Sequence, residues 1–274
     1  MDQIRQAVDR ARSAPSIKLE GGVIPAAANA TLAPLAGSRT GSPIKLDARH
    51  LESARIVAHL ATNPHSRAFD MLRTQTLQSL ETNGWQFLAI TSPTPACGKT
   101  VTAINLAFSI ARQPERSVLL VDLDVQKPRV AEYLGFKFDH GLIGALEGRV
   151  SLREATTEVG SGPYNFSVLP CEGHSPGSSE WMASQAMTNV LQAIRREFRS
   201  HIVVFDMPPI LLGDDVISVL PKMDAVLLIG GAGTTSLADI KECNKHLQSA
   251  NVLRIVVNKV SEAATPYYGY GAYG

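Results

Sequence analysis

Six short apolar runs between residues 85 and 260 constrain the fold of this chain more than any other feature. They read WQFLAIT, SVLLVDLDV, NFSVLP, HIVVFDMPP, DAVLLIGGAG and RIVVNKV. Each run is compact and continuously apolar, as expected for a strand buried on both faces of a parallel sheet. Helical or loop segments separate the runs, so the sequence predicts an α/β fold with a doubly wound, mostly parallel sheet flanked by helices.

The segments outside this pattern differ in composition. Residues 13–63 are rich in Ala, Pro, Gly and Ser and lack sustained periodicity, which predicts a flexible linker. Apolar residues at helical spacing within residues 1–12 predict a short docking helix, although a frayed, solvated helix fits the same pattern. The folded domain is therefore expected at 64–262, followed by a tail at 263–274.

The stretch TSPTPACGKT, residues 91–100, joins the first apolar run to a segment with helical periodicity, VTAINLAFSIAR. Its end, GKT, matches a G-x-x-x-x-G-K-[ST] phosphate-binding loop, whereas Pro93 stands where the first glycine belongs. In such a loop, backbone N–H groups bind phosphates, the lysine contacts the β- and γ-phosphates of ATP and the hydroxyl binds Mg²⁺. The predicted ATP-binding residues of the loop are Ala96, Cys97, Gly98, Lys99 and Thr100.

Three carboxylates follow two of the predicted strands. Asp122 and Asp124 lie at the end of SVLLVDLDV, and Asp206 ends the strand of HIVVFDMPP. The carboxyl ends of parallel strands meet at one edge of the sheet, where α/β proteins bind ligands. Together with Thr100, these acids predict a Mg²⁺ site and a catalytic base; taken singly, each acid also fits a solvated strand end or a helix N-cap.

The last residues, TPYYGYGAYG, interleave four tyrosines with glycines. Glycine at this density disfavours a stable helix or strand, so the phenols are expected to be exposed to solvent. The candidate acceptors are Tyr267, Tyr268, Tyr270 and Tyr273.

Composition limits the classes of partner and compartment. A formal net charge of +1 gives no broad basic field, so charge does not indicate nucleic acid as a partner. No run approaches the roughly 18 to 20 apolar residues of a membrane span, so any membrane association is expected through a partner. The three cysteines, Cys97, Cys171 and Cys243, lack C-x-x-C spacing, which disfavours a zinc site or a disulfide framework and suits a reducing cytoplasm.

In their order and spacing, TSPTPACGKT, LLVDLDVQKP, VVFDMPP and the Gly/Tyr tail resemble the bacterial tyrosine kinases of capsule and exopolysaccharide synthesis, the CpsD/CapB/Wzc group. The resemblance extends over residues 66–274 and implies a MinD/ParA-type P-loop fold. It implies Lys99, Asp122 and Asp124 as catalytic residues and Thr100, Asp122 and Asp206 as metal ligands. The tail tyrosines would accept the γ-phosphoryl group of Mg-ATP from a neighbouring subunit.

The resemblance also implies partners. These are a membrane-embedded polysaccharide co-polymerase that activates the kinase, further copies of the chain, and a cognate phosphotyrosine phosphatase. The expected location is the cytoplasm, with recruitment to the inner face of the membrane by that partner. The function implied is regulation of polysaccharide polymerisation and export.

Two segments depart from the family pattern. The family motif D-x-D-x-R-R-P carries Gln126 and Lys127 here, and lysine keeps the charge of arginine but not its bidentate geometry. In the family's oligomerisation helix, E-x-x-R-x-x-R-T, the corresponding residues are Arg67, Asp70, Arg73 and Thr74. The first pair has exchanged sign, so an intersubunit salt bridge would need a different partner.

Two single residues have alternative interpretations. Asn258 ends the last strand, where related P-loop proteins often read the adenine edge; a role as a turn residue fits equally well. Cys97 in the loop is either an oxidation-sensitive thiol at a helix N-terminus or a small residue whose backbone alone binds phosphate.

Two other classes of function share the three motifs. One is a MinD/ParA-like ATPase; such proteins usually carry a second lysine near the start of the loop, where this chain has Thr94, and they lack a tyrosine tail. A nucleotide-binding scaffold of a polysaccharide export complex is the other, and nucleotide binding without turnover would distinguish it.

Overall fold

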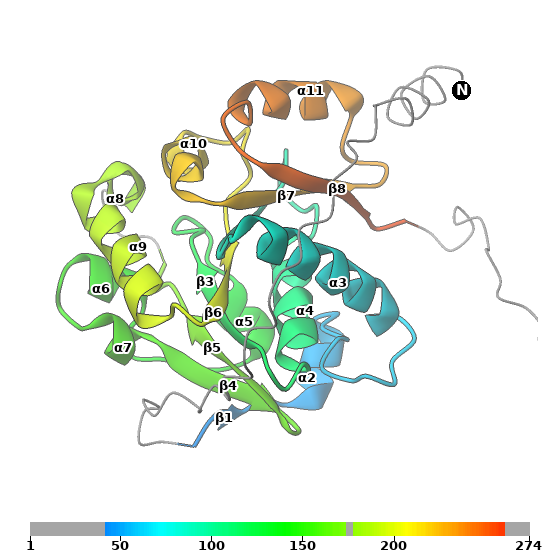
Figure 1. Ribbon diagram of the computed structural model, residues 1–274, viewed down its shortest axis with the longest axis vertical. Helices are drawn as coiled ribbons and strands as arrows, with labels where there is room; N and C mark the ends of the chain where they lie inside the picture. Colours follow the sequence, from blue (N-terminus) through cyan, green and yellow to red (C-terminus); the bar gives the residue numbers. More distant parts are fainter. Residues whose placement is uncertain (1–41, 174–177, 261–274) are drawn as a thin grey trace, which may run out of the picture. The chain divides into compact units, whose positions relative to one another are not determined.

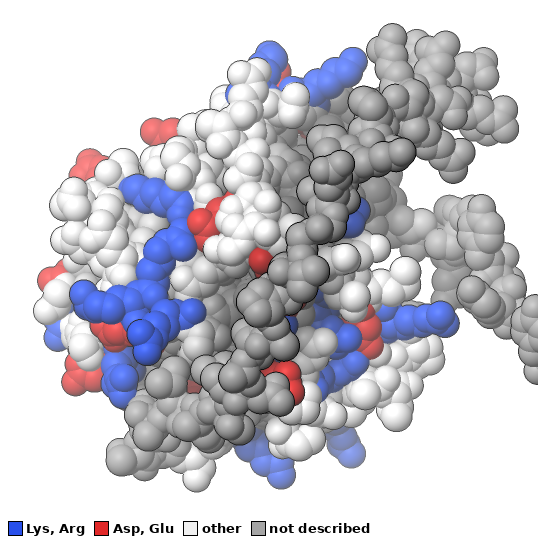
Figure 2. All heavy atoms as spheres, in the orientation of Figure 1, with Lys and Arg blue, Asp and Glu red and all other residues white. Residues whose placement is uncertain are grey.

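The computed structural model describes residues 42–173 and 178–260 (Figure 1). The predicted docking helix at 1–12, the first part of the predicted linker and the four tail tyrosines lie outside the described residues. Within the described ranges, no helix is both long enough and apolar enough to cross a membrane. On the face shown in Figure 2, acidic side chains lie among the basic ones.

An eight-stranded sheet in the order β1-β4-β5-β3-β6-β2-β7-β8 forms the centre of the fold. Every neighbouring pair is parallel except β4 and β5, which form an antiparallel pair. The fold class predicted from the apolar runs is therefore confirmed. The strands are β1 (Ile44–Lys45), β2 (Phe87–Thr91), β3 (Ser117–Asp122), β4 (Thr157–Ser161), β5 (Tyr164–Leu169), β6 (His201–Asp206), β7 (Ala225–Gly231) and β8 (Val252–Asn258).

Helices cover both faces of the sheet, which is why the central strands are apolar throughout. All residues of β2 and β7 are buried. One face packs against α2 (Ala48–Ser53), α3 (Ser66–Asn83), α4 (Lys99–Ala111) and α5 (Val130–Leu134). The other packs against α6 (Leu142–Leu146), α7 (Leu152–Ala155), α8 (Ser178–Ala183), α9 (Gln185–Glu197), α10 (Asp215–Val219), the 3₁₀ helix η1 (Leu220–Lys222) and α11 (Leu237–His246).

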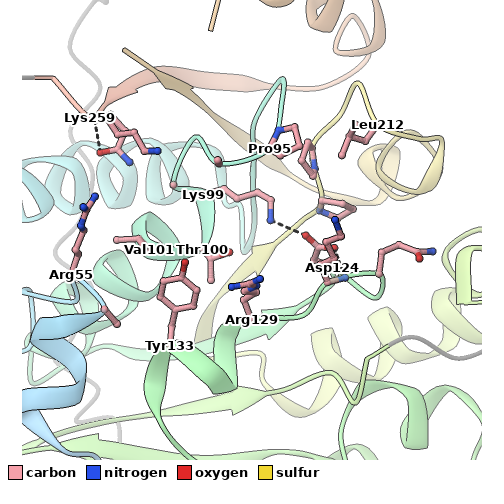
Figure 3. A pocket seen from close by; sticks show the side chains of 18 of the residues that line it. Arg55, Pro95, Lys99, Thr100, Val101, Asp124, Arg129, Tyr133, Leu212 and Lys259 are labelled. Atoms are coloured by element: carbon pink, nitrogen blue, oxygen red, sulfur yellow. Dashed lines mark hydrogen bonds and ion pairs between the residues drawn. The ribbon is translucent and has the colours of Figure 1, made fainter. Parts of the chain in front are cut away.

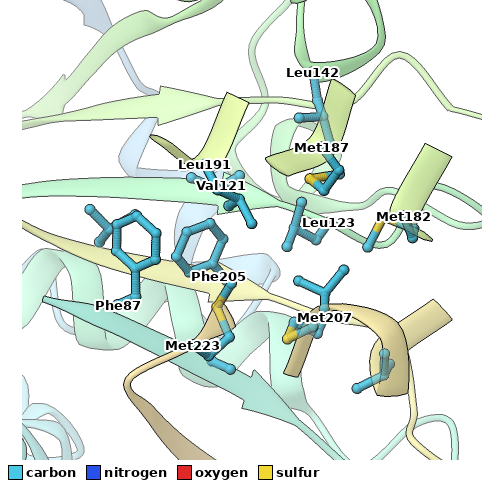
Figure 4. Packing of buried hydrophobic residues seen from close by; sticks show 14 of the residues in the cluster. Phe87, Val121, Leu123, Leu142, Met182, Met187, Leu191, Phe205, Met207 and Met223 are labelled. Carbon is cyan, nitrogen blue, oxygen red and sulfur yellow. The ribbon is translucent and has the colours of Figure 1, made fainter. Parts of the chain in front are cut away.

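The core on the second face contains aromatic and methionine side chains (Figure 4). Phe87 of β2 and Phe205 of β6 pack edge to face, with ring centroids 5.0 Å apart. Unbranched methionines fill irregular gaps readily, and Met182, Met187 and Met207 occupy the space between the sheet and the helices. This packing fixes β6, and with it the position of Asp206 at its end.

The structure corrects the predicted linker at 13–63 over its described part. Residues 42–63 are folded: β1 pairs with β4, and α2 follows it. Leu51 and Ile56 are fully buried, and Leu46 is 5% exposed. Their spacing of five residues fits neither a strand nor a helix period, so the apolar pattern did not reveal their burial. The folded domain thus begins before the predicted residue 64.

The helix α3 precedes the central strand β2. Its buried residues include Leu72, Leu77 and Leu80, which recur at helical spacing. The helix ends at Gly84, whose φ of 65° is a left-handed conformation that glycine adopts without strain. This turn leads the chain directly into β2.

Candidate functional site

The loop between β2 and α4 is held at its start by a neighbouring segment. The carbonyl oxygens of Ser92 and Pro93 accept hydrogen bonds from the N–H groups of Ile210 (2.8 Å) and Leu211 (3.2 Å). These contacts use carbonyl groups, so a proline at position 93 costs the loop no bond there. Pro93 is therefore compatible with the loop's observed position.

The second half of the loop has the backbone conformation of an anion-binding turn. Ala96 and Gly98 have φ values of 61° and 91°, and α4 begins directly after them at Lys99. A methyl group at Gly98 would clash with Nδ2 of Asn258, so a larger residue there would displace that side chain at the end of β8. Successive N–H groups at a helix N-terminus are suited to phosphate.

Lys99 lies between two carboxylates at the carboxyl edge of the sheet. Its Nζ is 2.8 Å from Oδ2 of Asp124 and 3.9 Å from Oδ1 of Asp206 (Figure 3). Burial alone would lower the pKa of Lys99, but the two carboxylates outweigh it and raise that pKa, so the ammonium stays charged. A buried cation next to the loop is suited to neutralising phosphate charge.

Asp206 is fully buried and binds the loop helix. Its Oδ2 accepts a hydrogen bond of 2.6 Å from the hydroxyl of Thr100, whereas its Oδ1 has no hydrogen-bond partner among the described residues. Burial raises the pKa of Asp206, and Lys99 opposes that rise. Thr100 and Asp206, both predicted as metal ligands, are thus in direct contact in the structure.

Asp122 differs from Asp124 in what it contacts. Its Oδ1 accepts from the N–H of Asp124 (3.1 Å), and its Oδ2 accepts from the N–H groups of Arg129 and Val130 (3.0 Å each). Burial and the neighbouring Asp206 raise the pKa of Asp122 to about 8. Asp122 therefore fastens the start of α5 to β3, whereas the side chain of Asp124 lines the cavity described below.

The oxygen donors at this edge of the sheet could bind Mg²⁺ only together with further ligands. No group of three or more His, Cys, Asp or Glu residues within 42–173 and 178–260 is arranged to hold a metal ion by itself. However, Mg²⁺ is commonly held by one or two carboxylates together with phosphate oxygens and waters. The hydroxyl of Thr100 and the Oδ1 of Asp206, which accepts no hydrogen bond from the described residues, fit that mode, because the nucleotide would supply the remaining ligands.

Asn258 contacts the loop from the end of β8. Its Nδ2 donates to the carbonyl oxygen of Cys97 (3.0 Å), and its Oδ1 accepts from the N–H of Lys259 (2.8 Å). The thiol of Cys97 is buried and lies 3.4 Å from the hydroxyl of Thr235. Burial would raise the pKa of Cys97, but hydrogen bonds with Thr235 and Thr94 outweigh it and lower that pKa.

A cavity of about 1110 Å³ opens over this edge of the sheet. Of the predicted ATP-binding residues, all but the buried Cys97 line it, and Asp124 lines it as well. The prediction did not include several other lining residues: Arg55, Val57, His65, Phe69, Arg129, Tyr133, Leu212 and Lys259. Most of these come from segments distant in sequence, so no local motif marks them.

The two departures from the family pattern have different outcomes. Gln126 and Lys127 line the cavity, and the N–H of Lys127 donates to Oδ1 of Asp124 (3.1 Å). Asp70 of α3 is bound within the chain, where it contacts Arg112 (2.6 Å) and the hydroxyl of Ser109 (2.6 Å). An intersubunit salt bridge at Asp70 would therefore compete with these intramolecular contacts.

Comparison with known proteins gives relatives of one kind. A putative tyrosine-protein kinase EpsB of Ralstonia solanacearum is 29% identical over 240 residues, which are 87% of this chain and 31% of that protein. The tyrosine-protein kinase CpsD of Streptococcus pneumoniae is 26% identical over 192 residues, 68% of this chain and 82% of the relative. The chain thus spans about a third of the length of the EpsB relative.

Solved structures share the fold. The kinase domain of the Escherichia coli tyrosine kinase ETK matches with a TM-score of 0.65 at 24% identity, covering 76% of this chain and 80% of that one. The cell division ATPase MinD of Pyrococcus furiosus matches with a TM-score of 0.54 at 20% identity, covering 63% and 71%. The relatives thus support the resemblance to bacterial tyrosine kinases inferred from the motifs, and the solved structures show the fold.

The sequence pattern of one nucleotide-binding family matches most of the folded part of the chain, residues 88–267. The matched range contains the loop, the carboxylates and Asn258, which the structure brings to one edge of the sheet. The chain belongs to the CobQ/CobB/MinD/ParA nucleotide binding domain family.

Proposed function

We propose that the chain is an ATP-dependent protein-tyrosine autokinase that transfers the γ-phosphoryl group of ATP to Tyr267, Tyr268, Tyr270 and Tyr273 of neighbouring subunits. The observation that carries this proposal is the placement of Lys99 between Asp124 and Asp206 beside a cavity large enough for a nucleotide and a second ligand. The relatives named tyrosine-protein kinases and the tyrosine-rich end of the chain support it.

Lys99 is the residue expected to change partners when ATP binds. In the structure its ammonium contacts Asp124 at 2.8 Å. The negative charge of the β- and γ-phosphates would draw it away from that carboxylate, while the loop N–H groups bind the phosphate oxygens. Mg²⁺, held by Thr100 and Asp206, would neutralise further phosphate charge.

Asp124 is the preferred candidate for the base that accepts the phenolic proton. Asp122 is the other acid that the resemblance implies, but both of its carboxylate oxygens accept backbone hydrogen bonds. Asp124 lines the cavity, and departure of Lys99 would free its Oδ2 for the tyrosine hydroxyl. A base within hydrogen-bond reach of the reacting hydroxyl is the geometric requirement.

The proposed setting is regulation of exopolysaccharide or capsule polymerisation and export. The partners are a membrane-embedded polysaccharide co-polymerase that activates the kinase, further copies of this chain, and a cognate phosphotyrosine phosphatase. The proposed location is the cytoplasm, at the inner face of the membrane. Each phosphate adds about −1.5 to −2 charges, so a multiply phosphorylated tail would be repelled from the carboxylates of the site.

Incubation of the full chain with Mg-ATP, followed by mapping of phosphotyrosine by mass spectrometry, tests the proposal. The expected result is phosphate on tyrosines within 267–273 of the parent and none on the Lys99→Met variant. Mixing Lys99→Met with a parent whose four tail tyrosines are replaced by Phe should label the tail of Lys99→Met, because transfer occurs between subunits. An unlabelled tail in the presence of the cytosolic segment of the membrane partner, with ATP binding shown in the same sample, would contradict it.

A MinD/ParA-like ATPase is the second candidate function. The structural similarity to MinD and the shared phosphate-binding loop favour it. Release of inorganic phosphate at a steady rate without tyrosine phosphorylation would support this reading. Nucleotide binding with neither hydrolysis nor transfer would instead support a scaffold of an export complex.

A further inference from the structure

One wall of the cavity comes from the segment that was predicted to be a linker. Glu52, Arg55 and Val57, which follow or end α2, line the cavity together with His65 and Phe69 near the start of α3. In Figure 3, Arg55 and Lys259 lie on one side of Lys99 and Thr100, while Asp124 and Leu212 lie on the other. The cavity therefore has two chemically different ends.

A buried asparagine of the loop helix holds this segment in place. Asn105, on α4, accepts hydrogen bonds at Oδ1 from the N–H groups of Val57 (2.8 Å) and Ala58 (2.9 Å). Its Nδ2 donates to the carbonyl oxygen of Arg55 (3.0 Å) and to that of Val101 (2.8 Å). One side chain thus fixes Arg55 relative to the first turn of the phosphate-binding helix.

At this end of the cavity, Arg55 and Lys259 have strained backbone conformations. Among the described residues, the non-glycine residues with positive φ are Arg55 (62°), Ala96 (61°) and Lys259 (61°), and all of them line the cavity. Non-glycine residues in this region of φ cluster at ligand sites, where the surrounding structure holds them. Strain alone does not identify a ligand, but Arg55 also carries a positive charge.

The guanidinium of Arg55 is available to a ligand. Within the described part of the chain, no hydrogen bond or ion pair to its side chain is present, and the residue is exposed to the cavity. Phe69 is half-buried and lines the same cavity, as does Glu52, which carries the opposite charge. A guanidinium and an aromatic ring are the side chains that stack on the flat faces of nucleobases.

The positions of Lys99 and the phosphate-binding loop set the direction in which a nucleotide would bind. In a phosphate-binding loop the lysine contacts the β- and γ-phosphates and the helix N-terminus lies against the phosphate chain. The terminal phosphate therefore points toward the carboxylates, Asp124 and Asp206, near Lys99. The nucleoside must then leave the loop on the opposite side, past Val101, toward Arg55.

We infer that Arg55, together with Phe69, binds the nucleoside part of the nucleotide, so that residues 52–57 complete a site whose phosphate end is the loop. This inference rests on the nucleotide binding in the proposed function, but not on transfer to tyrosine. It assigns a ligand-binding role to a segment upstream of the family match at residues 88–267.

Titration calorimetry of the full chain with Mg-ATP, Mg-ADP and Mg-tripolyphosphate tests the inference, because tripolyphosphate carries the phosphates without a nucleoside. Arg55→Gln should weaken ATP and ADP binding by the same factor, about 10- to 100-fold, and leave tripolyphosphate affinity unchanged. Phe69→Leu should give the same pattern. Arg49→Gln, on the same helix α2 but outside the cavity lining, is the matched control and should bind all three ligands like the parent.

The outcomes separate the inference from the proposed function. Equal loss of ATP and tripolyphosphate affinity in Arg55→Gln would overturn the nucleoside role, as would ATP affinity equal to that of the parent. A parent chain that binds neither ATP nor tripolyphosphate would overturn the proposed function as well. Thermal unfolding of each variant shows whether a loss of affinity reflects a loss of fold. If Arg55→Gln is unfolded, the affinities of Phe69→Leu for the three ligands test the inference instead.

Discussion

The two ends of the cavity are built in opposite ways. At the phosphate end, Thr100 and Asp206 are buried and the side chain of Lys99 is 12% exposed, and each has a charged or hydrogen-bonded partner within about one turn of the loop or at a strand end. At the other end, Arg55 and Lys259 are exposed and come from segments far apart in sequence. The phosphate end is therefore preorganised by local contacts, whereas the far end depends on the docking of one segment.

The phosphate end depends on local sequence, whereas the far end depends on a long-range contact. The phosphate end is formed by short strand-loop-helix geometry, so any chain with these residues at this spacing tends to form it. The far end exists because Asn105 binds the backbone of residues 55–58. Variants at the two ends should therefore affect transfer, stability and affinity in different proportions.

The largest expected effect is at Asp124. Asp124→Asn should lower the rate of tyrosine phosphorylation by about 10²- to 10⁴-fold, because a carboxylate that accepts the phenolic proton would be lost. Initial rates at saturating ATP measure this. Asp122→Asn is the matched comparison and should chiefly lower the free energy of unfolding, since Asp122 fastens α5. Equal loss of rate in the two variants, with stability unchanged, would break the distinction drawn between them.

The next effect is at Asn105. Asn105→Ala should lower the free energy of unfolding by about 2 to 4 kcal/mol, because several buried backbone groups lose their partner. Nucleotide affinity should fall as well, since Arg55 is no longer held. Urea unfolding with and without ADP measures both effects. A change below about 0.5 kcal/mol would show that residues 55–58 dock without this side chain.

A third effect concerns the contact between the loop and β8. Gly98→Ala should weaken ATP binding, because its methyl group would lie 2.2 Å from Nδ2 of Asn258 and φ at that position is 91°. The left-handed conformation alone costs roughly 1–2 kcal/mol. In the Gly98→Ala/Asn258→Ala double variant the clash disappears, so part of the lost affinity should return. No recovery in titrations of the double variant would mean that Asn258 does not limit the loop.

The smallest effect is remote from the cavity and provides a reference. Asp224 accepts hydrogen bonds from the N–H groups of Gln86 (2.9 Å) and Phe87 (2.8 Å) and pairs with Arg195 (2.8 Å). Burial would raise the pKa of Asp224, but these donors outweigh it and lower that pKa. Asp224→Asn should cost about 1–2 kcal/mol at pH 7 and leave nucleotide affinity unchanged.

The stabilisation that Asp224 provides should decrease as the pH falls. Because the folded-state pKa of Asp224 is lower than its unfolded-state value, the stabilisation is present above the unfolded pKa and is lost as the pH falls through the folded pKa. The difference in unfolding free energy between parent and Asp224→Asn should therefore shrink in acid. A difference that grows as the pH falls would contradict this assignment.

The sequence marked the residues of the phosphate end, and for the nucleoside it marked Asn258 but not Arg55 or Phe69. Lys99 and Thr100 belong to a contiguous motif, and Asp206 follows an apolar strand, so local patterns reveal them. The separate roles of Asp122 and Asp124 were not predictable, because they depend on which carboxylate meets the N–H groups of α5. Arg55 was missed because the buried residues around it, such as Leu51, follow no regular period.

The most direct test of this direction of nucleotide binding is a crystal structure of the full chain with Mg²⁺ and a non-hydrolysable ATP analogue. We predict that Lys99 leaves Asp124 for the β- and γ-phosphates, and that the base lies against Arg55 and Phe69. A nucleotide whose base lies instead toward Leu212, with the Lys99–Asp124 contact intact, would contradict both the proposed direction of binding and the division of the cavity into two ends.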